Sequence, residues 1–357
     1  MNENRMNEDI PEPAPLVEVR RGAITESRHR GHIAVVDGDG PVVAQLGAPE
    51  TLTYLRSSAK PHQAVPLITS GAAERYGFDD REIAVACASH SGEPVHVETV
   101  AKMLEKIGLD KSALKCGTHE PFSSEETRRL RASGEKPNVL QNNCSGKHTG
   151  MLALARHLDA PIETYDQPDN PVQLLIGRII EQFSGVSLED IAVGIDGCGV
   201  PVFGVTVRAM ALMYARLVAP PLDWDAETRA ACKRIVGAMT SHPGMVGGTV
   251  ERLDTEMMRA TEGALISKVG AEGVYTVGVL PQERWPRGLG LALKIEDGED
   301  RRARPVAVIE SLRQLGVLTQ EAYEAVKPYS NFIVYNHRGD TVGEVRASFE
   351  LKLIGTR

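Results

Sequence analysis

Short stretches near both ends of the chain have the hydrophobic pattern of β-strands. Residues 16–20, 32–36 and 42–46 alternate between apolar and polar positions or run through β-branched residues. Residues 332–335 and 341–345 repeat this pattern close to the C-terminus, and the polar turn between them predicts a hairpin. The pattern therefore predicts one sheet that is closed by the first and last segments of the chain.

Between these ends, apolar residues recur with the three- and four-residue spacing of helices. Pro94 and Pro171 stand at predicted first turns, and Gly108 and Gly185 mark the predicted ends. Further helices are predicted over residues 151–158, 207–217, 225–239 and 305–315. Short apolar runs predict strands over residues 83–88, 191–195, 264–268, 274–280 and 291–295. The predicted fold class is α/β (α+β), with a mixed sheet built from N- and C-terminal strands and a helical region between them.

The composition sets the size of the core and the domain organisation. The chain has 357 residues, of which 42% are hydrophobic, and this is enough for a large core. We expect a single domain of two coupled lobes over residues 16–357. Residues 1–15 are polar and rich in proline, and we expect them to form a disordered tail.

The charge, the hydropathy and the cysteines restrict the kinds of partner and the cellular location that we expect for the protein. The formal net charge of -8, without any block of basic residues, gives no support for nucleic-acid binding. No apolar run approaches the roughly 20 residues that cross a membrane, so we expect no membrane partner. The five cysteines are scattered and odd in number, which favours reduced thiols and a cytoplasmic location.

A serine and a lysine three residues apart follow the N-terminal strands. Ser57 and Lys60, in the segment RSSAKP at residues 56–61, would share one face of a helix. That spacing brings the Ser57 hydroxyl within hydrogen-bond reach of the Lys60 amine. A serine hydroxyl is a weak nucleophile until a base takes its proton, and a lysine is a base only when neutral. The pair is therefore a candidate nucleophile with its base.

The same spacing occurs at residues 112/115 and 133/136, and spacing alone does not distinguish the three pairs. The residues that flank Ser57 favour the first pair. Arg56 adds a fixed positive charge, and the apolar segment that follows can bury Lys60. Both effects lower the pKa of an amine, which a lysine base requires.

A second group of residues has the chemistry of a metal site. Cys144 and Lys147 stand where a helix is predicted to begin, and Cys198 lies in a glycine-rich turn after a predicted strand. Two thiolates, a nitrogen and an open position would suit zinc. Lysine binds a metal only after losing its proton, and a helix N-terminus favours the neutral amine. Two buried thiols and a solvated lysine are the plainer interpretation of these three residues.

Several further residues are candidates for a site. Ser89 follows a predicted strand and could place a second hydroxyl in a cleft, although serines are also common in turns. Asp196 could hold a substrate ammonium or form an Asx turn. Lys268, in Lys-Val-Gly, resembles the lysine-x-glycine strand of penicillin-recognising serine enzymes. Cys116 and His119 have ligand spacing, but the sequence shows no third partner for them.

Five short motifs together carry a resemblance to a known family. They are, in chain order, RSSAKP (56–61), SHSGE (89–93), NNCSGKH (142–148), DGCGVP (196–201) and KVGAEG (268–273). In this order they resemble the zinc-containing L-asparaginases of the rhizobial type, the asparaginase II protein family. The resemblance extends over roughly residues 17–344, and five motifs in order are more specific than any one alone. Residues 252–255 carry no motif that we can assign.

The resemblance implies a serine β-lactamase/penicillin-binding-like fold, a homodimer, and hydrolysis of L-asparagine to L-aspartate and ammonia. It makes residues 16–357 a catalytic domain with two Ser-Lys tandems, Ser57 with Lys60 and Ser89 with Lys268. The other implied site residues are the zinc ligands Cys144, Lys147 and Cys198, with water completing the site, and the substrate-binding residues Arg56, His148 and Asp196.

On this interpretation neutral Lys60 takes the Ser57 proton while the hydroxyl oxygen attacks the side-chain amide, and water later releases aspartate from the acyl-enzyme. The nearest alternative is a glutaminase or a β-lactam-recognising esterase of the same architecture, because one methylene discriminates asparagine from glutamine by only about 1–3 kcal/mol. An alternative of a different class is a zinc-binding or scaffold protein without catalytic activity.

Overall fold

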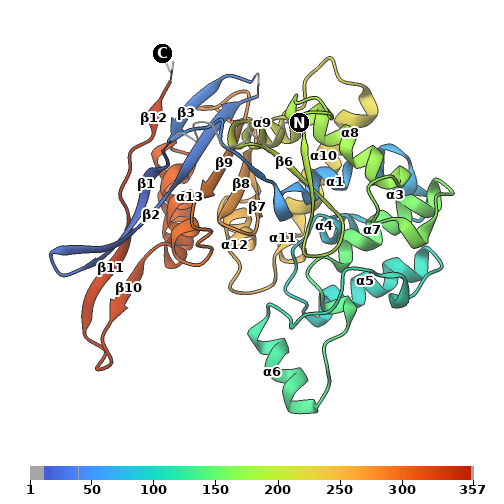
Figure 1. The fold of residues 1–357 in the computed structure, drawn as a ribbon, viewed down its shortest axis with the longest axis horizontal. Helices are drawn as coiled ribbons and strands as arrows, with labels where there is room; N and C mark the ends of the chain where they lie inside the picture. Colours follow the sequence, from blue (N-terminus) through green and yellow to red (C-terminus); the bar gives the residue numbers. More distant parts are fainter. Residues whose placement is uncertain (1–11, 39, 355–357) are drawn as a thin grey trace.

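The computed structural model describes residues 12–38 and 40–354 of the chain. A large antiparallel sheet with helices on both faces forms one part, and a helical region that carries a small sheet forms the other (Figure 1). The strands are β1 (Ala14–Arg21), β2 (Ile24–Asp37), β3 (Val42–Leu46), β4 (Leu52–Tyr54), β5 (Ala192–Ile195), β6 (Pro201–Thr206), β7 (Leu265–Val269), β8 (Val274–Val279), β9 (Leu289–Ile295), β10 (Phe332–Tyr335), β11 (Thr341–Ala347) and β12 (Lys352–Leu353). The α-helices are α1 (Lys60–Gln63), α2 (Val65–Thr69), α3 (Ala72–Arg75), α4 (Asp80–Ala86), α5 (Pro94–Lys106), α6 (Ser124–Ser133), α7 (Ser145–His157), α8 (Pro171–Ser184), α9 (Val207–Val218), α10 (Ala226–Ser241), α11 (Pro243–Val246), α12 (Leu253–Ala260), α13 (Ala303–Gln314) and α14 (Gln320–Val326).

The large sheet joins the two ends of the chain. Its strand order is β10-β11-β1-β2-β9-β8-β7, with β3 beside β2 and β12 beside β3. Val17 of β1 lies opposite Ala347 of β11, so the first and last strands are neighbours, as the sequence predicts. Among the described residues every strand pair of this sheet is antiparallel, so the expectation of a mixed sheet was wrong. The predicted α/β class, with terminal strands and a helical region, is confirmed.

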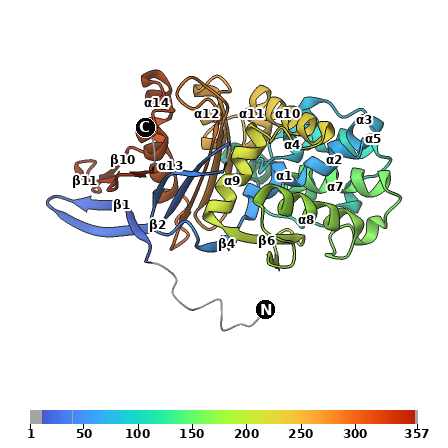
Figure 2. The ribbon, with the colours of Figure 1, turned by 90° about the horizontal axis from the view of Figure 1, so that it is seen from above.

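The core lies on both faces of the central strands. Helix α9 packs on β2, β8 and β9, and α13 packs on the opposite face (Figure 2). Strand β8 is buried at every position, which explains why its sequence is a continuous apolar run rather than an alternation. At Gly290 the backbone of α9 comes so close to β9 that only a glycine fits.

The apolar run at residues 83–88 forms a helix and not the strand that we expected. Helix α4 begins with a capping box, in which Asp79 accepts from the Glu82 N–H and the Glu82 carboxylate accepts from the Asp79 N–H. The helix packs against α5, α7, α10 and α11 and is buried around its circumference. A helix without a polar face lacks the period that distinguishes it from a buried strand.

The start of the sheet lies inside the segment that we expected to be a tail. Ala14 and Pro15 belong to β1 and pair with Gly31 and Arg30, so the tail prediction is wrong for these two residues. Residues 1–11 of the predicted tail lie outside the described residues. One continuous hydrophobic cluster runs through the sheet and the helical region. The two-lobe domain, the homodimer and the cytoplasmic location stay predictions.

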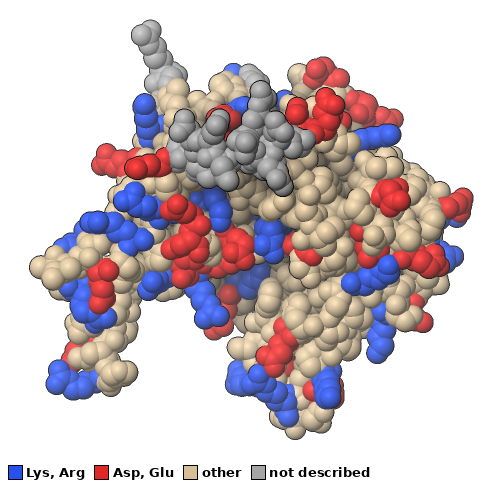
Figure 3. All heavy atoms as spheres, viewed as in Figure 1, with Lys and Arg blue, Asp and Glu red and all other residues tan. Residues whose placement is uncertain are grey.

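The outer surface mixes charges of both signs. On the face in Figure 3, lysine and arginine side chains are interspersed with aspartate and glutamate, and the surface is hollowed between the β10–β11 end and the helical region. In the part of the chain that the structure describes, no helix is both long and apolar enough to cross a bilayer.

We predict that Gly290→Ala destabilises the protein by at least about 2–3 kcal/mol, because the added methyl group overlaps the Ala211 carbonyl oxygen in the backbone of α9. Gly237→Ala in α10 is the matched control, since a methyl group there meets no atom within 4 Å. The control should gain about 0.5–1 kcal/mol from helix propensity. Urea unfolding measures both changes, and equal stability of the two variants would contradict the close packing of α9 on β9.

Candidate active site

Two serines line one cavity at the junction of the sheet and the helical region. Ser57 lies on the 3₁₀-helix η2 (Arg56–Ala59), directly before α1, and Ser89 lies in the loop after α4. The cavity has a volume of about 470 Å³, and Asn143 and Asp254 also line it. The site therefore draws on segments that are far apart in sequence.

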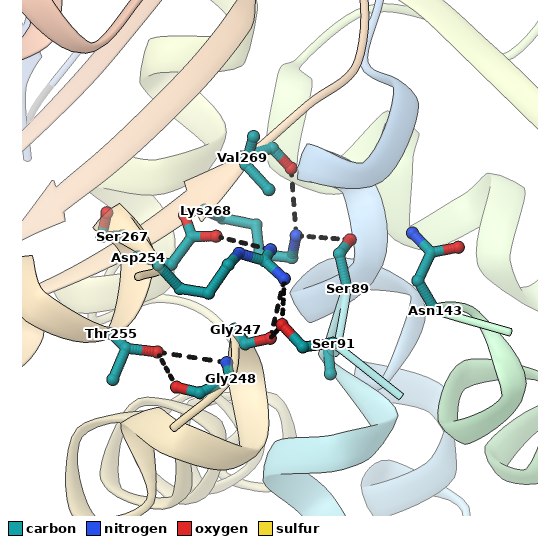
Figure 4. A network of polar contacts seen from close by, with 12 residues as sticks. Ser89, Ser91, Asn143, Gly247, Gly248, Asp254, Thr255, Ser267, Lys268 and Val269 are labelled. Atoms are coloured by element: carbon teal, nitrogen blue, oxygen red, sulfur yellow. Dashed lines mark hydrogen bonds and ion pairs between the residues drawn. The ribbon is translucent and has the colours of Figure 1, made fainter. Parts of the chain in front are cut away.

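Two buried lysines meet at the Ser89 hydroxyl, and Figure 4 shows one of them, Lys268, beside Ser89 and Val269. The Lys268 amine, which projects from β7, lies 2.9 Å from Ser89 Oγ, and the Lys60 amine lies 3.0 Å from the same atom. Lys60 is 1% exposed and Lys268 is 0% exposed. The structure thus brings together three of the four predicted catalytic residues around one oxygen atom.

The two lysines differ in their remaining contacts. Lys60 Nζ also donates to Ala88 O at 2.6 Å and to Asn143 O at 3.2 Å, so three acceptors match the three N–H groups of an ammonium. Lys268 Nζ has only Val269 O, at 3.0 Å, in addition to Ser89. A neutral Lys268 can donate to Val269 O and accept the Ser89 proton on its lone pair along the 2.9 Å contact.

Burial is the largest cause that lowers the pKa of Lys268, which falls to about 7. The positive charges of Lys60 and Arg252 lower this pKa further, and the Asp254 carboxylate opposes them. A lysine with a pKa near 7 is neutral in a large fraction of molecules at neutral pH. Lys268 therefore has the property that a general base requires.

Ser57 does not have the contact that its spacing predicts. Among the described residues no hydrogen bond joins Ser57 to Lys60, because the three N–H groups of the Lys60 amine point to Ala88, Ser89 and Asn143. Ser57 instead faces the shared cavity. The described structure therefore lacks the predicted hydrogen bond between Ser57 and Lys60, and the amines of Lys60 and Lys268 both lie at Ser89.

Arg56, next to Ser57, holds the turn of η2 in place. Its φ of 50° lies in the left-handed region, which is unusual for a residue other than glycine. Arg56 Nε lies 2.8 Å from Asp196 Oδ1, and the Asp196 carboxylate also accepts from the Gly197 N–H at 2.9 Å. The structure brings these two predicted substrate-binding residues together as an ion pair.

The three predicted zinc ligands lie in one buried cluster. Lys147 Nζ lies 3.0 Å from Cys198 Sγ, at the start of α7. A hydrogen bond from the Cys198 thiol holds the pKa of Cys144 well below its ordinary value, and the same bond, with burial, raises the pKa of Cys198. Burial opposes a charged Lys147, but the two neighbouring sulfur atoms raise its pKa overall. The expectation that the helix N-terminus favours a neutral Lys147 is therefore not met.

His148, the remaining predicted substrate-binding residue, borders the same cluster. Its Nδ1 lies 2.7 Å from the Tyr165 hydroxyl, while none of the described residues bonds its buried Nε2. Burial lowers the pKa of His148 to about 4, so the ring is neutral at physiological pH.

The donor set of this cluster fits zinc in part. Two thiols and an amine gather there, and thiolates are ligands that zinc favours. Within residues 12–38 and 40–354, however, no group of three or more histidine, cysteine, aspartate or glutamate side chains is arranged to hold a metal ion. A zinc ion in this cluster would therefore depend on the unusual lysine ligand.

The other candidate pairs have local partners. Lys115 forms an ion pair with Asp166 at 2.9 Å, and Lys136 is exposed. His119 lies 3.1 Å from Asn143 Oδ1 and from the Asn143 N–H, so it supports the loop before α7. Local contacts of this kind account for these residues, and no catalytic role is needed to explain them.

The sequence analysis missed Arg252 and Asp254, which line the cavity at the start of α12. They carry no motif, and only the fold of residues 247–252 brings them to the serines. The Thr249 N–H donates to the Glu93 carboxylate at 3.0 Å, and Arg252 Nη1 donates to Ser91 Oγ at 2.9 Å. The SHSGE motif is therefore also the attachment site of this segment.

Comparison with protein families gives one match that covers most of the chain. Residues 17–347 match the family model described as L-asparaginase II. The chain belongs to the L-asparaginase II family. The membership identifies it as an amidohydrolase, which agrees with a cavity lined by two serines, one of which is bonded to two buried amines. Comparison with curated proteins found no sequence match.

The solved structures that resemble this chain are only weakly similar to it. A probable glutaminase from Bacillus subtilis, complexed with 6-diazo-5-oxo-L-norleucine, is 12% identical with a TM-score of 0.37, over 84% of each chain. Native Mglu is 14% identical with a TM-score of 0.41, over 83% of this chain and 66% of that chain. A β-lactamase from Burkholderia ambifaria is 15% identical with a TM-score of 0.37, over 81% of this chain and 94% of that chain. These likenesses carry no information on the substrate of this chain.

We predict that Lys268→Met raises the free energy of unfolding most strongly at low pH. The native pKa is about 7, whereas an unfolded lysine titrates near pH 10.4. Between these values the unfolded chain binds more protons, so wild-type stability rises with pH and is lowest, by about 3–5 kcal/mol, below pH 7. Urea unfolding should therefore show a gap between variant and wild type that is large at pH 6 and small at pH 10.

Lys102→Met on an exposed position of α5 is the control for this comparison and should show no such gap. A stability gap for Lys268→Met that stays constant from pH 6 to pH 10 would contradict a depressed pKa of Lys268.

Proposed function

We propose that this protein hydrolyses L-asparagine to L-aspartate and ammonia through a serine acyl-enzyme. The observation that carries the proposal is the Ser89 hydroxyl between two buried amines in a cavity shared with Ser57. The L-asparaginase II family supports asparagine as the substrate. A glutaminase of the same architecture is the second candidate, because one methylene discriminates asparagine from glutamine by only about 1–3 kcal/mol.

In the proposed reaction, neutral Lys268 takes the proton of the Ser89 hydroxyl as its oxygen attacks the side-chain amide carbon. Lys60 donates to the Ser89 oxygen and holds it in place for the attack, while the negative charge of the tetrahedral intermediate develops on the substrate's carbonyl oxygen. The protonated Lys268 then gives its proton to the departing ammonia. Water repeats the sequence on the acyl-enzyme, with Lys268 again as the base, and releases aspartate.

Ser57 has a different role in this proposal from the one that its sequence suggests. Its hydroxyl faces the cavity and has no bond to a base, so it is suited to bind the substrate or its attacking water. Arg56 and Asp196 hold the turn that presents it. The sequence-based alternative, with Ser57 as the nucleophile, requires Lys60 to leave Ser89.

We further propose that Cys144, Lys147 and Cys198 hold a zinc ion beside this cavity. The cluster of two thiols and an amine supports this, and Asn143, next to Cys144, links it to the cavity wall. When bound, zinc would supply a Lewis acid that orients or polarises a substrate oxygen. The ion would also stabilise the folded state, because binding energy at a buried site adds to folding energy.

We predict that Ser89→Ala lowers kcat for L-asparagine by about 10³-fold or more, because it removes the hydroxyl that the amines activate. Ser57→Ala should lower kcat by only about 10–100-fold. Ser58→Ala is the matched control, since the neighbouring Ser58 hydroxyl bonds Leu55 O and does not line the cavity. Ammonia release measures all three.

An acid quench during turnover, followed by peptide mass analysis, locates the acyl group. An aspartyl group on Ser57 would overturn the assignment to Ser89 but keep the proposed reaction. Parallel assays with L-glutamine and a chromogenic cephalosporin test the substrate. Faster ammonia release from glutamine would replace asparaginase with glutaminase, and no release from either amide would contradict the proposal.

We predict that wild-type protein purified with zinc in the medium retains about one zinc per chain and that Cys198→Ala loses it. Cys232→Ala, which removes another buried thiol from α10, should retain the metal. Elemental analysis measures the content, and zinc should raise the melting temperature of wild type and of Cys232→Ala but not of Cys198→Ala. Equal zinc content in all three proteins would contradict these ligands.

A further inference from the structure

The cavity that both serines line is also lined by an arginine, Arg252, whose Nε and Nη2 edge donates no hydrogen bond to any described residue. Arg252 lines this cavity and its side chain is 16% exposed. Nη1 uses its two N–H groups on Ser91 Oγ, at 2.9 Å, and on Gly247 O, at 2.8 Å. These two bonds fix the guanidinium against the segment that follows Ser89.

The opposite edge of the guanidinium carries Nε and Nη2. No described residue accepts a hydrogen bond from either atom, and neither atom is sealed from the cavity. The Asp254 carboxylate forms an ion pair with Nη2 at 3.5 Å. An arginine edge of this kind matches the two oxygen atoms of a carboxylate.

Another half-buried arginine of the cavity, Arg304, is less suited to bind an anion. Arg304 Nη1 is engaged with Asp300 and donates to Gly270 O at 2.7 Å. Arg304 Nε is buried without a partner, so a ligand cannot reach the equivalent edge. Arg252 therefore combines a fixed position, an accessible edge and close proximity to Ser89.

We propose that Arg252 binds the α-carboxylate of the substrate through its Nε and Nη2 edge. This inference rests on the proposed function and deepens it, since it restricts the substrate class to free amino-acid amides. An asparagine inside a peptide has no α-carboxylate and would leave the Arg252 edge unpaired. A site built to bond such a group rejects analogues that lack it.

The first test compares side-chain deamidation of L-asparagine and L-asparaginamide, whose α-carboxylate is replaced by an amide. We expect wild type to prefer L-asparagine by at least about 100-fold in kcat/KM. Arg252→Met should reduce that preference at least tenfold, mainly through KM, and Arg252→Lys should lie between them because a lysine keeps the charge but not the fork. Chromatography of the deamidated products separates side-chain from α-amide cleavage.

Arg259→Met is the matched control. Arg259 also bonds a carbonyl of the same segment, Thr249 O at 3.1 Å, but it does not line the cavity. Its substrate preference should equal that of wild type. An unchanged preference in folded Arg252→Met, or equal use of both amides by wild type, would overturn the proposal.

A second measurement does not depend on turnover or on a stable Arg252→Met. Calorimetry should show that wild type binds L-aspartate at least tenfold more tightly than L-isoasparagine, in which the α-carboxylate is an amide. Arg252→Lys should lose most of this difference. If wild type shows the difference but hydrolyses neither amide, the carboxylate subsite stands and the proposed function fails. If amide hydrolysis occurs but binding shows no such difference, the subsite fails and the proposed function stands.

Discussion

The site depends on the burial of two lysine amines against a single serine oxygen. Both amines lie within 3.0 Å of Ser89 Oγ, and neither has contact with bulk water. Removing two amines from water is costly, and their positive charges repel each other. The free-energy cost of burying a charged amine is smaller for Lys60 than for Lys268, because Lys60 has three acceptors and Lys268 only two. This asymmetry leaves Lys268 as the amine with fewer acceptors, and burial lowers its pKa to about 7.

Carboxylates and cations around this pair balance its charge. Asp254 opposes the lowering of the Lys268 pKa, while Arg252 adds to it. The same two residues form a loose ion pair at the start of α12, so one segment contributes to the electrostatics of the amine and to the wall of the cavity. On the other side, the ion pair of Arg56 and Asp196 fixes the turn that presents Ser57. Each serine therefore has its own arginine and aspartate nearby.

Much of this arrangement could be predicted from the sequence, for physical reasons that differ from one element to another. In β11 the exposed Glu344 and Arg346 flank the buried Val345, and this period is visible in the sequence, whereas the polar residue of β1 that gives its alternation, Glu18, is buried and bonded to Arg346. Helix α4 was mistaken for a strand because it is buried all round. The motif residues of the site could be found by their spacing, but the contact of Lys60 with Ser89 depends on how α1 meets the loop after α4. Arg252 and Asp254 gave no signal because their position depends on long-range contacts with Ser91 and Glu93.

The location of Lys268 on β7 has a consequence for how the chain acquires reactivity. Strand β7 is an outer strand of the sheet and pairs only with β8, which follows it in sequence. A nascent chain that ends before residue 268 already contains Ser57, Lys60 and Ser89 but lacks Lys268, the proton acceptor of the proposed reaction. On the proposed mechanism, the last quarter of the chain therefore supplies the group that activates the Ser89 hydroxyl.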